Sequence, residues 1–286
     1  NDGDGSFSMG YTHQDIQELS GMASTTANSS YGKYAASDYN NRTAQRSIYE
    51  TEHRFFATAS STHYFLGADK PTTFNLYFER KSGLPGTYSW DTYTSSNYGG
   101  TAYQQEAFGY EKNLNDDSSH LLYVPSGVSD PNVCWGSCAA PDLAIAAQVL
   151  DTLYNKLGLQ GYAGQIVPNG VYEYPWRTSL DLKITQILPG FRAEDEFVIS
   201  LGIMNLLNLL DSDKGEAKYG PYNGKMAVLD MYMNEDFTKY IYPNYRGRGY
   251  PDYAYGFNSS NPKGIRKSAV NSIWRAQLGF TYKFSF

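Results

Sequence analysis

The sequence predicts an all-β fold: a section of an antiparallel transmembrane β-barrel with about six strands, long extracellular loops and one short loop helix. Three observations predict it. Several segments alternate apolar and polar residues with a period of two. The connections between these segments alternate between short turns and very long loops. The final segment is an alternating strand whose apolar positions become aromatic toward its end.

The composition suits β-strands joined by polar turns. Charged residues make up 18% of the chain, below the usual quarter or so, and Tyr alone occurs 27 times. Mean hydropathy is −0.52, and no apolar run approaches the roughly 18–20 residues of a membrane helix. A barrel strand is apolar on one face only, so low hydropathy does not exclude a membrane barrel. The net charge of −6 argues against a nucleic-acid partner.

The last strand shows the alternation most clearly. Its apolar face consists of every second residue: Trp274, Ala276, Leu278, Phe280, Tyr282, Phe284 and Phe286. The residues between them are polar or small: Arg275, Gln277, Gly279, Thr281, Lys283 and Ser285. A tilted barrel strand needs about 9–11 residues to cross a bilayer, so this segment is long enough.

Six segments alternate in this way, and we expect strands near residues 5–18, 48–64, 71–83, 176–188, 196–209 and 272–286. Two pairs of them are joined by short turns, near 65–70 and 189–195. The other connections are the long segments 19–47, 84–175 and 210–271. Outer-membrane barrels have short periplasmic turns and long outer loops. If the C-terminus lies on the periplasmic side, all three long segments are extracellular.

Two of the long segments have predicted structure of their own. Residues 141–157 place apolar side chains at helical spacing, with Pro141 near the start and Gly158 after the end. The apolar positions are Leu143, Ala146, Ala147, Leu150, Leu153, Tyr154 and Leu157. We expect a short amphipathic helix there, and a strand pair over Met226–Tyr242. Residues 240–257, rich in Tyr, Gly and Pro, suit an adaptable surface loop.

Several stretches resemble the C-terminal barrel region of TonB-dependent outer-membrane receptors, and most closely the Oar-like branch. The stretches are His53–Phe55, Glu79–Pro85 with Tyr88–Ser89, Gly164–Gly170 with Pro175–Trp176 and Leu180–Lys183, and Asn205–Leu210. The chain also ends in Tyr282, Phe284 and Phe286 at alternate positions. This ending looks like the aromatic C-terminal signature that the barrel-insertion machinery reads.

The resemblance implies a barrel of about 22 strands around a plug domain, in the outer membrane of a Gram-negative bacterium. It implies energised uptake of a bulky nutrient, with an inner-membrane complex of the TonB type as partner. Outer-membrane lipid, lipopolysaccharide and a small, peptide or sugar ligand would be further partners. Six strands cannot close such a barrel, and no plug-like domain is evident. We therefore expect the chain to be a C-terminal section that the rest of the barrel and the plug complete.

Residues on the polar faces of the strands would then face the lumen and contact the plug or solvent. The candidates are Asp181, Lys183, Arg275, Gln277 and Lys283. The aromatic residues near strand ends suit interfacial girdles. Aromatic residues in the long loops either pack those loops together or stack on a ligand.

Cys134 and Cys138 are the two cysteines of the chain, and both fall in a predicted extracellular loop. We expect them to form a disulfide because that side of the membrane is oxidising. A metal site at this pair is disfavoured, because no histidine or further cysteine lies nearby in the sequence to complete four ligands.

The sequence gives little indication of a metal site or a catalytic site. Asp211, Asp213 and Glu216 superficially resemble a Ca²⁺ loop, but their spacing differs from the twelve-residue pattern, and an ordinary polar turn is favoured. The four histidines, at 13, 53, 63 and 120, show no paired-ligand spacing along the sequence. No nucleophile or phosphate-binding motif is present, so we expect neither an enzyme nor a cofactor.

Two other functions remain open at this stage. The barrel could anchor a surface assembly without transport, because the plug region that would decide this is not in the sequence. Alternatively, the chain could be a secreted β-sandwich that binds carbohydrate through its aromatic loops. A sandwich would bury the apolar strand faces between two sheets. The test between these classes is whether residues such as Leu278 and Phe280 face lipid or a protein core.

Overall fold

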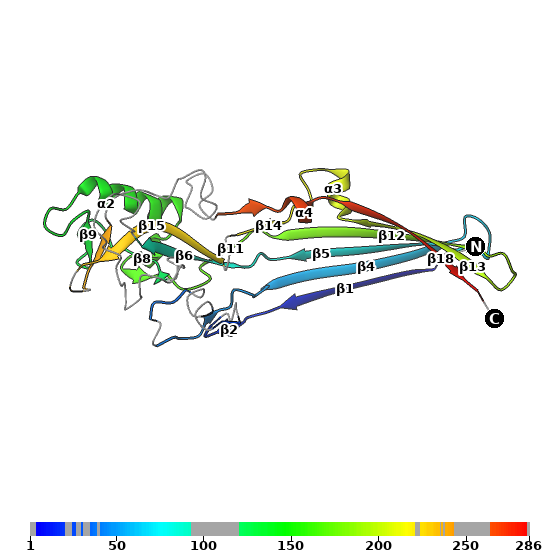
Figure 1. The fold of residues 1–286 in the computed structure, drawn as a ribbon, viewed down its shortest axis with the longest axis horizontal. Helices are drawn as coiled ribbons and strands as arrows, with labels where there is room; N and C mark the ends of the chain where they lie inside the picture. The colour runs from blue at the N-terminus through cyan, green and yellow to red at the C-terminus, as the bar shows by residue number, and fades with distance from the viewer. Residues whose placement is uncertain are drawn as a thin grey trace.

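The computed structural model describes residues 4–20, 25–26, 30, 35–38, 41–92, 120–220, 224–234, 236, 238–242 and 264–284. Within these ranges the chain is mostly β-strand with few helices. Figure 1 shows a long sheet with a compact body at one of its ends, which we call the cap. No helix in the described part of the chain is both long and apolar enough to cross a membrane.

The long sheet, which we call the main sheet, has six antiparallel strands in the order β1-β4-β5-β12-β13-β18. Their bounds are β1 Gly5–His13, β4 His53–His63, β5 Thr72–Lys81, β12 Arg177–Pro189, β13 Glu196–Met204 and β18 Arg275–Lys283. The order follows the sequence, so each strand pairs with the strand before and after it in this list. Each of the six segments with predicted alternation contributes one strand.

The short connections between strands lie at one end of the main sheet, and the long connections lie at the other end. Residues 64–71 and 190–195 form short turns at one end, and the chain termini lie at that same end (Figure 1). In the second turn, Gly190 lies so close to Asp195 that a side chain at this position would clash. The long connections all leave from the opposite end, where the cap lies. We refer to these as the turn end and the cap end.

Several predicted strands are shorter than expected: β4, expected from residue 48, begins at His53, and β18, expected from 272, begins at Arg275. The strand expected over 5–18 ends at His13, and β2 (Gln17–Glu18) then pairs with β3 (Gln45–Arg46) beyond it. The strand expected over 196–209 stops at Met204, because Asn205 adopts a left-handed conformation with φ 55°. The helix α3 (Leu206–Leu210) follows. A left-handed residue interrupts strand pairing, so the leucine-rich end of this segment is helical.

The cap is built around a second sheet with the order β11-β6-β15-β16-β9, and β7 also pairs with β6. These strands are β6 Pro85–Thr92, β7 His120–Leu121, β9 Val133–Trp135, β11 Tyr172–Glu173, β15 Lys225–Met233 and β16 Tyr240–Tyr242. The predicted strand pair over Met226–Tyr242 is confirmed by β15 and β16. Two pairs, β6 with β15 and β9 with β16, are parallel and join different long segments.

Smaller elements complete the described structure. The strand pairs are β8 (Tyr123–Val124) with β10 (Gln165–Ile166), and β14 (Lys218–Tyr219) with β17 (Arg266–Lys267). The helical elements are α2 (Leu143–Leu150), η2 (Asp151–Lys156), η3 (Gln160–Tyr162) and α4 (Ala269–Ser272). The element α4 directly precedes β18 and so positions the start of that strand.

The buried apolar core of the described residues lies in the cap, not in the main sheet. Its members come from both long segments, 84–175 and 210–271, and include Tyr88, Leu122, Val149, Leu153, Met226 and Tyr242. Sequence reasoning treated these segments as loops with a little local structure. They instead fold together, because strands from one segment pair with strands from the other and bury a shared core.

The predicted helix over 141–157 exists, and five of its seven predicted apolar positions lie in or against the core: Ala146, Leu150, Leu153, Tyr154 and Leu157. Asp142 caps α2 by accepting a hydrogen bond from the Ala144 N–H. After Leu150 the chain continues as the π-helix η2, which has more residues per turn than an α-helix. Leu143, at the start of α2, is 65% exposed, and Val149 and Thr152 are buried residues that the prediction did not include.

Candidate functional site

The register of the main sheet aligns its apolar residues on one face. In β1, alternate residues lie opposite alternate residues of β4, and the alignment continues across the sheet to β18. The face consists of Phe7, Met9, Tyr11, Phe55, Ala57, Ala59, Phe74, Leu76, Phe78, Leu180, Leu182, Ile184, Ile199, Leu201, Ile203, Ala276, Leu278 and Phe280. We call this set the apolar face.

The apolar face is not covered by any described element. Met9 on β1 is 76% exposed, and Phe280 on β18 is 62% exposed. The apolar residues of the central strands are half-buried, because large side chains flank them on both neighbouring strands. Apart from α3 beside β12, the strands of the main sheet make their substantial contacts with one another. A continuous apolar surface of this size needs a partner, either lipid or protein.

Aromatic side chains lie at both ends of the apolar face. At the cap end, Tyr11 packs against Phe55, and Trp176 stacks on both Phe55 and His53. The guanidinium of Arg80 lies 5.5 Å from the Trp176 ring centre. The aromatic contacts at the turn end are His63 with Phe65, Phe65 with Phe74, Phe197 with Phe280, and Phe191 with Tyr282. Aliphatic residues fill much of the space between the two aromatic belts.

The opposite face of the main sheet is polar. All five residues predicted to face a lumen lie on it: Asp181, Lys183, Arg275, Gln277 and Lys283. Asp181 accepts a hydrogen bond from the Asn205 N–H, Arg275 donates to the Val270 carbonyl, and Lys283 pairs with Glu196 at 3.0 Å. Large apolar residues are fewer on this face; they include Phe56, Ile187, Val198 and Met204. The Phe56 ring lies directly over Gly10, where a side chain would clash.

Of the three aromatic residues predicted to form the C-terminal signature, Tyr282 and Phe284 lie within the described residues. The hydroxyl of Tyr282 donates to Asp195 and accepts from the Phe191 N–H, so it ties the last strand to the turn before β13. Phe284 stacks beside Tyr282 and is 58% exposed. The third predicted signature residue, Phe286, lies outside the described residues.

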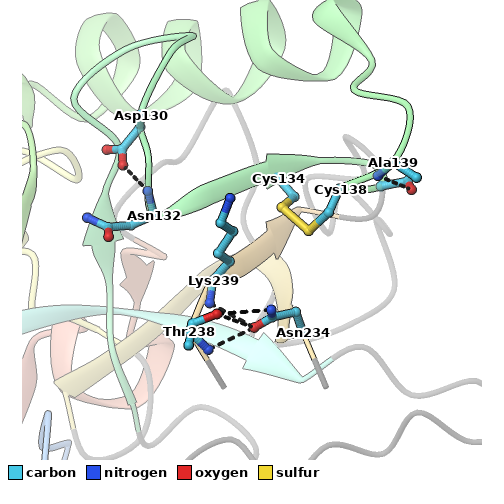
Figure 2. Close-up of a disulfide and its surroundings, with 9 residues drawn as sticks. Asp130, Asn132, Cys134, Cys138, Ala139, Asn234, Thr238 and Lys239 are labelled. Atoms are coloured by element: carbon cyan, nitrogen blue, oxygen red, sulfur yellow. Dashed lines mark hydrogen bonds between the residues drawn. A yellow bond between two sulfur atoms is a disulfide. The ribbon is translucent and has the colours of Figure 1, made fainter. Parts of the chain in front are cut away.

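Cys134 and Cys138 form a disulfide, as predicted. Figure 2 shows it joining β9 to the segment that leads toward α2. Beside it, the Asn234 side chain accepts hydrogen bonds from the Thr238 and Lys239 N–H groups, which closes the connection from β15 to β16 (Figure 2). The disulfide therefore holds one edge of the cap sheet where β9 meets β16.

Removing the disulfide should loosen this edge of the cap. The bond closes a loop of only a few residues, so chain entropy gives about 2 kcal/mol of stabilisation. We expect the double variant Cys134→Ala, Cys138→Ala to lower the free energy of unfolding of the cap by that amount, measured by hydrogen exchange. A reducing agent should produce the same change in the native protein and none in the double variant. Equal sensitivity of both proteins to the reducing agent would disprove this role.

The weak calcium candidates are engaged with lysines. Asp211 accepts from the Asp213 N–H and pairs with Lys214 at 3.4 Å. Glu216 pairs with Lys218 and Lys267. These ammonium groups lie where a cation would have to bind, so the arrangement favours the polar-turn interpretation.

His120 is buried in the cap, where β7 pairs with β6. Burial, together with the positive charge of Lys225, lowers its pKa from 6.5 to about 4. Asp130 shapes a nearby loop: burial raises the pKa of its carboxyl, but N–H groups of Ser126 and Asn132 outweigh this and lower it overall. The cap thus contains a neutral histidine and an ionised aspartate at neutral pH.

The buried His120 makes the cap sensitive to acid. The unfolded chain binds a proton near pH 6.5, whereas the folded cap does so only near pH 4. The contribution of His120 to stability is therefore complete above pH 6.5 and is lost as the pH falls toward 4. We expect His120→Gln to reduce the loss of cap stability over this range, measured by urea unfolding at successive pH values. An unchanged pH profile in the variant would contradict the assignment.

Sequence reasoning missed one cluster at the cap end. His13, Glu52 and His53 come together where β1 and β4 meet, because the register sets His13 directly opposite His53. Their spacing along the sequence gave no signal; the antiparallel pairing of two predicted strands is the feature that could have found them. Among the residues that the structure describes, they form a group whose ligand atoms lie close enough to bind one metal ion.

The described structure thus defines a class of protein with an amphipathic antiparallel sheet, aromatic belts at both ends of its apolar face and a separately packed cap. No protein-family model, curated protein or solved structure matches the chain. The function proposed below therefore rests on the residues of the chain and their arrangement.

Proposed function

We propose that the main sheet is part of the wall of an outer-membrane β-barrel, and that this barrel belongs to a receptor of the TonB-dependent class. The observation that carries the proposal is the uncovered apolar face, backed by a polar face on the same strands. A sheet in lipid needs this pattern, because its outer side contacts acyl chains and its inner side contacts water or a plug.

The dimensions of the apolar face support a membrane position. Trp176, which directly precedes β12, lies in one belt, and Gln186 on β12 lies near the other, ten residues further along the chain. At about 3.3 Å per residue this is about 33 Å along the strand, or about 25 Å in height at a tilt of about 40°. The apolar band of outer-membrane barrels has that height, and aromatic girdles border it on both sides.

The connections support one orientation. Every long connection of the main sheet leaves from the cap end, and both short turns lie at the other end. Outer-membrane barrels place long connections outside the cell. The cap would then be extracellular, where a disulfide such as Cys134–Cys138 is stable. In this position the cap forms part of the external mouth through which a bulky nutrient would enter.

The edges of the main sheet indicate what else the wall needs. Among the described strands, β1 and β18 each pair on one side only. An unpaired strand edge is not tolerated in lipid, so further strands must pair with both. A β-sandwich would instead need a second sheet on the apolar face. The cap sheet lies beyond the ends of the strands (Figure 1), which argues against that alternative.

Surface labelling of intact cells tests the proposed orientation. Val128 in the cap is 48% exposed, and Leu66 in the turn after β4 is 55% exposed. Because Cys134 and Cys138 are bonded to each other, a new cysteine is the one that reacts. We expect a large membrane-impermeant maleimide to label Val128→Cys on intact cells, and Leu66→Cys only after the outer membrane is broken. Labelling of Leu66→Cys on intact cells, or of neither variant, would refute the orientation.

A photo-crosslinking experiment tests the receptor class. Gln277 and Leu278 are neighbours on β18 that point to opposite faces. In a receptor, a photoreactive amino acid at position 277 should crosslink to a plug domain inside the barrel, and one at position 278 should not. If neither position 277 nor position 278 formed a crosslink to protein, no plug would lie beside the polar face, and a plugged receptor would be ruled out.

A further inference from the structure

Two histidines and a glutamate meet at the cap end of the main sheet. His13 is the last residue of β1, and it lies opposite His53, the first residue of β4, with 5.2 Å between ring centres. Glu52 directly precedes β4, and its Oε1 lies 3.2 Å from the Nε2 of His53. One ligand atom from each of the three residues lies within 4.8 Å of the other two.

The Nδ1 atoms of both histidines are hydrogen-bonded to oxygen atoms, and the Nε2 of His53 faces the Glu52 carboxylate. The Nδ1 of His13 donates to the backbone carbonyl of Glu52 at 3.2 Å. The Nδ1 of His53 is hydrogen-bonded to the Tyr11 hydroxyl at 2.9 Å, and Trp176 stacks on the His53 ring. Histidines that bind metals have this arrangement, in which one nitrogen is oriented by an oxygen and the other binds the ion.

The surrounding charges favour a cation. Arg46 pairs with Glu50, Glu52 and Glu173, each at 2.6–2.7 Å. Three carboxylates thus share one guanidinium beside the histidine pair, so among the described residues Glu52 has no cation of its own. A divalent ion would be attracted to Glu52, because unlike charges at this separation attract even near the protein surface.

We propose that His13, Glu52 and His53 bind a divalent transition-metal ion of the zinc type. Two imidazoles and one carboxylate suit zinc and its neighbours, whereas calcium and magnesium prefer oxygen ligands alone. Three protein ligands leave one or more coordination positions for water. Such an ion would bind the end of β1 to the start of β4, and so fasten the first strand of the main sheet at its cap end. This inference does not depend on the proposed membrane function.

Zinc binding to the purified full chain tests the proposal. Isothermal titration with ZnCl₂ should show one site that His13→Asn or Glu52→Gln weakens by at least tenfold, while His63→Asn leaves it unchanged. His63 is the matched control because it lies on β4 at the turn end, far from the cluster. Tyr11→Phe removes the hydrogen bond to His53 and should weaken binding about 10–100-fold.

Two further measurements separate loss of binding from loss of folding. Co²⁺ in place of zinc should give visible absorption bands in the native protein and the His63→Asn variant, but not in His13→Asn. Zinc should also raise the thermal midpoint of the native protein, because an ion that binds only the folded state stabilises it. Absence of zinc binding to the native protein, or equal affinity in native and His13→Asn proteins, would overturn the proposal.

Discussion

Ile184→Lys is expected to destabilise the folded protein in lipid by about 1–2 kcal/mol, because a lysine on the lipid side costs about 2–4 kcal/mol at the bilayer midplane and less toward the interface. Ile184 lies on the apolar face of β12, between Phe74 and Leu201, on the turn-end side of the midplane. The guanidinium dependence of folding into phospholipid vesicles, followed by tryptophan fluorescence, measures the change.

The neighbouring residue provides the matched control. Thr185 points to the polar face, and its partners across the sheet are the uncharged Thr73 and Ser200. We expect Thr185→Lys to cost less than Ile184→Lys, because the long lysine side chain at a half-buried position on the polar face can extend its ammonium group to water. Equal losses in the two variants would show that the apolar face does not contact lipid.

Leu153→Ala should destabilise the cap by about 2–5 kcal/mol while leaving the main sheet folded. Leu153 lies in η2 and is fully buried in the cap core. Removing its side chain leaves a cavity that the neighbouring strands cannot fill completely. Hydrogen exchange of the β15 amides, read by mass spectrometry, should become much faster, whereas exchange of β12 should not change.

Leu143→Ala on the adjoining helix α2 is the control for this effect. Leu143 is 65% exposed, so its truncation should cost less than about 0.5 kcal/mol. If β12 exchanged as fast as β15 in Leu153→Ala, the cap and the main sheet would unfold as one unit, contrary to the separate core that the structure shows.

The strands of the main sheet could be predicted because their pattern is local. The alternation from Trp274 onward sets which residues share a face, and the short turns set which strands are neighbours. The strand ends were less accurate. Nothing in the apolar pattern of residues 205–210 distinguishes a strand from a short helix, and the left-handed Asn205 decides it.

The cap could not be predicted because its contacts are not local. Its parallel pairs join β6 to β15 and β9 to β16, which are far apart in the sequence. Short strands of this kind have no turn between them to signal the pairing. The helix over 141–157 was predicted with most of its buried face, because the helical spacing of its apolar residues is a local pattern, but the π-helical geometry after Leu150 was not predicted.

Among the candidate sites, too, the local one could be predicted from the sequence and the one that depends on strand pairing could not. The Cys134–Cys138 disulfide was evident from the sequence, because the two cysteines are close together and have no other cysteine to pair with. The His13–Glu52–His53 cluster was missed, because it depends on the register between β1 and β4. A search for ligands across predicted strand pairs, in addition to spacing along the chain, would have found it.

Nitroxide scanning of β18 in membrane vesicles tests most directly whether the apolar face contacts lipid. Collision with oxygen, which concentrates in the bilayer, should be frequent for labels at Ala276, Leu278 and Phe280. Collision with a water-soluble nickel chelate should be more frequent at Gln277 and Thr281. The predicted result is that oxygen access is high at the even-numbered positions and nickel access is high at the odd-numbered positions. Equal access of the nickel chelate at all five positions would contradict a membrane wall.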